Sequence, residues 1–244
     1  MEELERYLPY GRLDANYLVN CSRRLKFVYV ETPKVACSTI KRVLQLLEVD
    51  RDATLVPDDV HDREASPLLS PFDSSFDIDE LFGGEAGYFV FAFVRNPFSR
   101  VLSAYLDKVI NNAWEKARLL PGLGFSPEED VDFRSFLEAV ASLSEYDRDI
   151  HWKSQSYILQ PGTVSYDFVG RFENFPAAFQ AVVKKLSPGK EMPIQDNSVT
   201  HHKTNAKDKI AQYIGSVERD LILSIYEDDF MRFCYSHDPA FSRC

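Results

Sequence analysis

The feature that most constrains this chain is a run of seven consecutive apolar residues, Tyr88–Val94. A strand with one wet face would alternate apolar and polar residues, so the unbroken run predicts a strand buried on both faces. Asn96 and Pro97 follow at the positions of a helix N-cap and a first helical residue. We therefore predict an α/β fold in three layers, with a central parallel sheet flanked by helices.

Two further segments follow the same order of strand, turn and helix. The run Lys26–Val30 precedes a turn, and apolar residues then recur at spacings of three and four from Ile40 to Leu47. The run Ser165–Val169 precedes a second such pattern between Phe175 and Leu186. Each segment predicts a strand that leads into an amphipathic helix.

The rest of the chain offers weaker local signals. A capping-box pattern at Ser126–Glu129 predicts a helix start, and the apolar residues Phe133, Phe136, Leu137 and Val140 just after it predict the buried face of that helix. A last helix is predicted over Val217–Phe233. The stretch Asp50–Gly87 is rich in Pro, Asp and Ser and predicts a long surface excursion. Because no linker interrupts the chain convincingly, we predict a single domain of residues 1–244.

Charge argues against one class of partner and for another. The formal net charge is −10, which disfavours a protein that grips nucleic acid over its whole surface. However, residues 23–42 and 95–108 together hold nine cations and two anions, and the remaining chain holds 19 cations and 36 anions. Both segments follow predicted strands, where helix N-termini bind anions. A ligand with two separated phosphate groups would suit them.

Several features bear on location and metals. Met1–Gly11 lacks the pattern of a secretory signal, and no window is apolar enough to span a membrane. The four cysteines, Cys21, Cys37, Cys234 and Cys244, form no Cys-x-x-Cys pair. We therefore expect a soluble, cytoplasmic protein without a metal site.

The first turn does not match two familiar phosphate loops. A Walker A loop would need two glycines, and Lys34 precedes the Ser38–Thr39 pair by four residues. A phosphatase loop of the Cys-x5-Arg kind would need arginine at position 43, which is Val43. Cys37 is therefore expected to be a small packing residue.

These residues resemble the sulfotransferases. TPKVACSTIKRVL (Thr32–Leu44) is similar to their 5′-phosphosulfate-binding loop, and FVRNPFSRVLSAYLDK (Phe93–Lys108) to their 3′-phosphate-binding segment. His151–Gln155, Tyr166–Phe175 and Ile225–Tyr235 resemble later blocks of the Golgi-type carbohydrate sulfotransferases, in the same order. The resemblance implies a P-loop-like fold and transfer of a sulfuryl group to a hydroxyl.

It also implies a donor, 3′-phosphoadenosine 5′-phosphosulfate (PAPS), and a donor product, adenosine 3′,5′-bisphosphate (PAP). Lys34 would contact the 5′-phosphate and the bridging oxygen, with Ser38 and Thr39 bonding the phosphosulfate. Arg95 and Ser103 would hold the 3′-phosphate. The donor-binding residues implied are Pro33, Lys34, Val35, Ala36, Cys37, Ser38, Thr39, Arg95 and Ser103.

Transfer also needs a general base, for which histidine is suited at neutral pH. Of the five histidines, His61 is the first choice, because it lies in the excursion between the two donor segments. Glu173, Glu31 and His151 are the alternatives. His201 and His202 belong to a later loop that could close on the nucleotide.

The acceptor is expected to be a hydroxyl group of a carbohydrate or a small metabolite. Two other functions stay open from the sequence. A nucleotide-kinase-like phosphotransferase would also cradle phosphates between a strand and a helix. A non-catalytic nucleotide-binding protein would keep the donor residues and lack the base.

Overall fold

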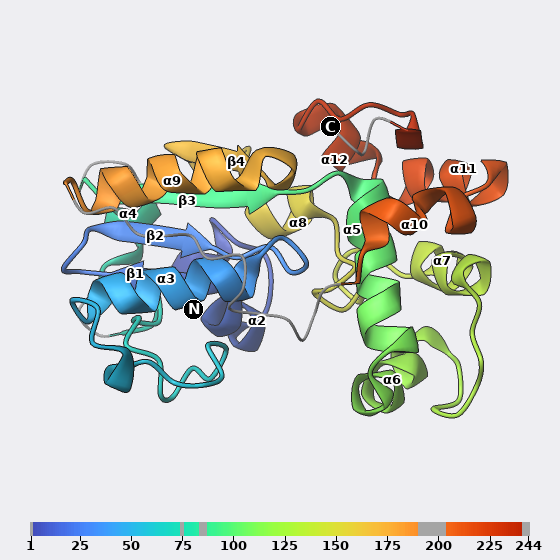
Figure 1. The fold of residues 1–244 in the computed structure, drawn as a ribbon, viewed down its shortest axis with the longest axis horizontal. Coiled ribbons are helices and arrows are strands. Elements are labelled where there is room, and N and C mark those ends of the chain that lie inside the picture. Colours follow the sequence, from blue (N-terminus) through green and yellow to red (C-terminus); the bar gives the residue numbers. More distant parts are fainter. Residues whose placement is uncertain (1, 74–75, 83–86, 190–203, 241–244) are drawn as a thin grey trace. The chain divides into compact units, whose positions relative to one another are not determined.

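The computed structural model describes residues 2–73, 76–82, 87–189 and 204–240, which fall into two compact units (Figure 1). The first unit draws on residues 1–94 and 158–200, and the second on residues 95–157 and 201–244. The prediction of one domain over 1–244 stays a prediction. Within the described residues, every helix is too short or too polar to cross a membrane.

The first unit is built on a four-stranded sheet of order β1-β2-β3-β4 (Figure 1). The strands are β1 (Val19–Ser22), β2 (Phe27–Val30), β3 (Phe89–Val94) and β4 (Phe168–Arg171). β2, β3 and β4 run parallel, which confirms the predicted α/β fold. β1 pairs antiparallel with β2, so the sheet is mixed rather than wholly parallel. An antiparallel neighbour needs only a short turn, and residues 23–26 provide it.

Helices α3 (Cys37–Glu48) and α9 (Phe175–Leu186) cover one face of this sheet. Their apolar stripes are the two that the sequence predicted, and they pack on aromatic residues of β2 and β3. Val28, Val30, Val90 and Ala92 alternate with those aromatics and are also buried, so the sheet is covered on both faces. The unit also contains α1 (Glu2–Glu5), α2 (Arg12–Leu18), η1 (Ala53–Leu55), α4 (Ile78–Phe82) and η4 (Phe172–Asn174).

β4 begins at Phe168, three residues after the start of the predicted strand Ser165–Val169. Asp167 occupies the strand entry, where its carboxylate accepts a hydrogen bond from the Val90 N–H at 2.8 Å. Pairing then continues through Gly170, which sits opposite Phe93. A Cβ at position 170 would lie 2.3 Å from the Phe93 ring, so a glycine is required there.

The second unit is helical. Its elements are α5 (Pro97–Tyr105), the π-helical turn η2 (Leu106–Ile110), α6 (Ala113–Leu119), η3 (Leu120–Leu123), α7 (Phe133–Ser142), the start of α8 (Gln155–Leu159), α10 (Ala206–Tyr213), α11 (Ser216–Ile225) and α12 (Glu227–Arg232). Asn96 caps α5 as predicted, because its side chain accepts a hydrogen bond from the Phe98 N–H at 3.0 Å.

Two helix predictions in this unit were correct in place and wrong in extent. Ser126–Glu129 forms a turn, and the helix begins only after Asp132, whose carboxylate caps the Ser135 N–H at 2.9 Å. The predicted helix Val217–Phe233 is divided into α11 and α12 at Tyr226. The Tyr226 hydroxyl donates a hydrogen bond to the Trp152 carbonyl at 2.9 Å and is buried.

Candidate functional site

The turn between β2 and α3 has the shape of an anion cradle. Lys34 and Ala36 adopt left-handed backbone conformations, with φ of 70° and 56°. Such conformations are costly for residues with a Cβ and concentrate at functional sites. Ala36 is the N-cap of α3 and has no side-chain acceptor for the first N–H groups of that helix. These groups and the helix dipole therefore favour a bound anion.

A buried hydroxyl beside this turn fits the same interpretation. Thr32 is 1% exposed, and its Oγ1 has no hydrogen-bond partner within the described part of the chain. Buried hydroxyls in folded proteins are generally paired with protein, water or ligand. The side chain of Val35, by contrast, belongs to the hydrophobic core, so only its backbone could face a ligand.

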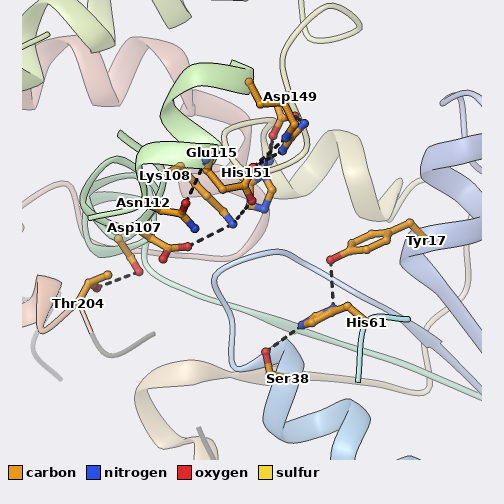
Figure 2. Close-up of polar contacts among 12 residues, drawn as sticks. Tyr17, Ser38, His61, Asp107, Lys108, Asn112, Glu115, Asp149, His151 and Thr204 are labelled. Carbon is orange, nitrogen blue, oxygen red and sulfur yellow. Dashed lines mark hydrogen bonds and ion pairs between the residues drawn. The ribbon is translucent and has the colours of Figure 1, made fainter. Parts of the chain in front are cut away.

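His61 reaches this turn from the long excursion, and its ring contacts Ser38 and Tyr17 (Figure 2). Its Nε2 lies 2.9 Å from the Ser38 Oγ, and its Nδ1 lies 3.1 Å from the Tyr17 hydroxyl. Its Nδ1 is also 3.3 Å from the Lys41 Nζ. His61 and Ser38, both predicted from the sequence, are thus direct neighbours.

Two opposite charges lie near the Nδ1 of His61. The Lys41 Nζ is 3.3 Å away, and a Glu31 carboxylate oxygen is 3.8 Å away. An ammonium group favours an unprotonated Nδ1 and a carboxylate favours a protonated one, so each tautomer of the neutral ring has a partner here. Lys41 also pairs with Glu31 at 2.6 Å, and both side chains are 1% exposed.

Glu31, Cys37 and His61 have ligand atoms within 4.8 Å of one another, as a metal site requires. Lys41 already supplies the positive charge beside Glu31. Burial of the Cys37 thiol, and secondarily the Glu31 carboxylate, raises the pKa of Cys37 to about 12. Because Lys41 already neutralises Glu31, this group fits a polar cluster beside the turn better than a metal site.

The second pair of predicted donor residues lies in the other unit. Arg95 is 7% exposed, and its Nε donates a hydrogen bond to the Ser99 Oγ at 2.9 Å. Ser103 is 3% exposed, and its Oγ lies 3.1 Å from the Thr204 Oγ1. Arg95 lies between the end of β3 and Asn96, the N-cap of α5, and Ser103 lies about two turns into α5, as the spacing predicted.

The predicted site residues thus divide between the units. Residues 33–39 and His61 come together in the first unit, at the carboxyl ends of its parallel strands. Arg95 and Ser103 belong to the second unit, and Arg95 directly follows Val94, the last residue of β3. The chain therefore leaves the sheet at the edge where the first turn lies.

The alternative bases have different surroundings. The Nδ1 of His151 lies 2.6 Å from an Asp149 carboxylate oxygen (Figure 2). Burial works to raise the pKa of Asp149, but the hydrogen bond and charge of His151 outweigh it and keep that pKa below its usual range. Glu173 lies in η4. His201 and His202 fall outside the described residues.

Sequence analysis missed the partners that hold these residues. Tyr17, on α2, contacts His61 across 44 positions of sequence, which no local pattern reveals. Lys41 was counted as part of a cationic segment, but its ammonium forms a buried ion pair with Glu31. Lys108 is likewise paired with Glu115 at 2.6 Å, and Arg24 with Asp50 at 3.3 Å. A charge count cannot separate such paired cations from those that face a ligand.

Comparisons with known proteins identify relatives of this chain. The model of the sulfotransferase family matches residues 18–236. Human carbohydrate sulfotransferase 9 is 28% identical over 239 residues, and mouse carbohydrate sulfotransferases 14 and 8 are 29% and 28% identical over 231 and 236 residues. These alignments cover 86%, 88% and 87% of this chain.

The chain spans only 51%, 59% and 55% of the length of those three relatives. No solved structure matches the chain. The family model nevertheless covers most of the 244 residues, including both cationic turns and the excursion that carries His61. The chain belongs to the sulfotransferase family.

Proposed function

We propose that this protein transfers the sulfuryl group of PAPS to a hydroxyl group of a carbohydrate or a small metabolite. The observation that carries the proposal is the turn before α3, where Lys34 adjoins a helix N-terminus whose N-cap has no side-chain acceptor. The relatives named as carbohydrate sulfotransferases support a carbohydrate as the acceptor class.

The donor would be held at its two anionic ends. Lys34, the hydroxyl groups of Ser38 and Thr39, and the first N–H groups of α3 would bind the 5′-phosphosulfate. Arg95 and Ser103 would bind the 3′-phosphate. The buried Thr32 hydroxyl offers one further donor beside the turn. All of these groups recognise phosphate oxygens without a metal ion.

In the reaction, the acceptor oxygen forms a bond to sulfur while the bond from sulfur to the bridging oxygen breaks. Negative charge grows on that bridging oxygen, which leaves as part of PAP. Lys34 is the residue proposed to stabilise this charge, because its ammonium acts on charge that develops only in the transition state. Its position at a strained turn would keep it aimed without reorganisation.

We propose His61 as the base that takes the proton of the acceptor hydroxyl. For this role its Nε2 must be unprotonated, so the ring proton must lie on Nδ1, where the Tyr17 hydroxyl at 3.1 Å can accept it. Ser38 would turn from His61 to the donor when the donor binds. If His61 instead keeps its proton on Nε2, it orients Ser38 and another group is the base.

The test is a comparison of ligands by isothermal calorimetry and mass spectrometry. PAP should bind and raise the melting temperature, since a ligand that binds only the folded protein stabilises it. ATP with Mg²⁺ should bind more weakly, and a carbohydrate acceptor should gain the mass of one sulfuryl group when PAPS is supplied. Tighter binding of ATP than of PAP would favour a phosphotransferase. PAP binding without turnover of any acceptor would favour a non-catalytic nucleotide-binding protein.

A further inference from the structure

Two segments singled out in the sequence, His151–Gln155 and Ile225–Tyr235, have no role in the proposed chemistry. The structure brings them together behind Arg95, within the second unit. We propose that Gln155 and Asp229 are positioning residues that hold Arg95 for recognition of the 3′-phosphate. This inference rests on the proposed function and assigns it two further residues.

The side-chain amide of Gln155 forms hydrogen bonds with both backbone polar groups of Arg95. Its side-chain Oε1 accepts a hydrogen bond from the Arg95 N–H at 2.8 Å, and its Nε2 donates to the Arg95 carbonyl at 2.8 Å. Gln155 is fully buried, so water cannot replace these bonds. The amide thus acts as a short piece of strand beyond the end of β3.

Asp229 determines the orientation of that amide. Its carboxylate accepts hydrogen bonds from the Gln155 N–H at 2.9 Å, the Gln155 Nε2 at 3.2 Å and the Ser156 N–H at 2.7 Å. A carboxylate can only accept, so the NH₂ group of Gln155 must face Asp229. The oxygen of the amide must then face the Arg95 N–H, and the reversed amide is excluded.

The same carboxylate is buried at a cost that other groups offset. Asp229 is fully buried, and this burial raises its pKa, while the charge of Arg100 and the N–H groups of Gln155 and Ser156 act to lower it. Arg100 in turn donates hydrogen bonds to the Lys153 carbonyl at 2.7 Å and the Ile150 carbonyl at 3.4 Å. The 150–156 segment is therefore tied both to Arg95 and to the next turn of α5.

This arrangement matters for binding because a guanidinium recognises phosphate through fixed geometry. The backbone of Arg95 is held by Gln155, and its side chain is held by Ser99 at 2.9 Å. A preorganised arginine loses little conformational freedom when a phosphate binds. Loosening its backbone should therefore weaken the contact to the 3′-phosphate and leave contacts to the rest of the nucleotide unchanged.

The experiment compares PAP with AMP, which lacks the 3′-phosphate, by isothermal calorimetry on the full chain. In Gln155→Met, which keeps the side-chain volume but loses both hydrogen bonds to Arg95, the preference for PAP over AMP should fall about tenfold, as expected for a lost polar contact. Its Kd for AMP should stay within about twofold of wild type. The double variant Arg95→Ala/Gln155→Met should prefer PAP no less than Arg95→Ala does.

Two further variants separate positioning from general stability. Gln155→Glu should lose the preference at pH 8 and regain it near pH 5.5, because the introduced carboxyl can donate to the Arg95 carbonyl only when protonated. Phe133→Leu, a buried change on α7, should lower the melting temperature and leave the preference unchanged.

Three results would overturn the inference. An unchanged PAP preference in Gln155→Met, or an equal loss in Phe133→Leu, would reduce Gln155 to a packing residue. A pH-independent Gln155→Glu variant would do the same. If the wild-type protein itself does not prefer PAP over AMP, both the proposed function and this inference are wrong. That result is seen in the wild type, whereas failure of this inference alone is seen only in the variants.

Discussion

The buried ion pair between Lys41 and Glu31 offers the sharpest test of how the first half of the site is held together. The two side chains approach to 2.6 Å and are each 1% exposed. The Lys41 Nζ also lies 4.5 Å from the centre of the Tyr17 ring and 3.3 Å from the Nδ1 of His61. Lys41→Met keeps most of the side-chain volume and removes the ammonium group, with its charge and its contacts to Tyr17 and His61.

The expected cost follows from what the substitution leaves behind. An unpaired carboxylate at Glu31 would stay buried, and breaking a buried pair in this way costs about 3–5 kcal/mol. For a chain of this size, that loss corresponds to a drop in Tm of roughly 6–20 °C. The double variant Glu31→Gln/Lys41→Met removes both charges and should recover all but about 1–2 kcal/mol of the loss.

Guanidinium denaturation followed by circular dichroism measures these differences. Lys184→Met, at an exposed position of α9, is the matched control and should change stability by less than about 1 kcal/mol. A Lys41→Met variant within 1 kcal/mol of wild type would refute the idea that this pair anchors the site. A double variant as unstable as the single one would show that the loss comes from packing rather than from the stranded charge.

Three other predictions concern the chemistry. Arg95→Ala should mainly weaken donor binding, and Lys34→Ala should reduce turnover further than affinity, because charge on the bridging oxygen develops in the transition state; equal effects on PAP affinity with an unchanged rate at saturating PAPS would contradict these roles. His61→Ala should leave PAP binding nearly intact, lower turnover by about 10²- to 10⁴-fold and remove the acid limb of the pH–rate profile; a variant that keeps that limb would mark His61 as an orienting residue. The Cys37 thiol, with a pKa of about 12, should resist iodoacetamide at pH 8, whereas the exposed Cys234 should react first, as peptide mapping would show.

The fold could be predicted where a segment carries its own evidence. Tyr88–Val94 is apolar on both faces, and Asn96 and Pro97 mark a helix start whatever surrounds them, so β3 and α5 were found correctly. β1 was not found, because Val19–Ser22 is short and half polar and becomes a strand only through its partner β2. The capping pattern at Ser126–Glu129 does not begin a helix. Asp132 caps α7 instead, because it directly precedes the apolar residues that α7 buries.

The site could be predicted only in its local parts. The turn at 32–39 was visible because Lys34, Ser38 and Thr39 lie within six positions of one another. The contact between His61 and Ser38 spans 23 positions and was not predicted; His61 was chosen only because transfer needs a base and because it lies between the two donor segments. Gln155 was quoted within a block of sequence without a role, because its partners Arg95 and Asp229 lie 60 and 74 positions away.

The residues of the two halves of the proposed donor site are held in position by different interactions. The difference shows where the chain places its few buried charges. In the first unit, a strained turn and an uncapped helix N-terminus present N–H groups, while the buried cation Lys41 is neutralised by Glu31. In the second unit, a neutral amide and a buried carboxylate fix the backbone of Arg95. On the proposed function, anion recognition would depend on a few fixed donors rather than on a broad basic surface, and a chain of net charge −10 could then bind a ligand with two anionic ends.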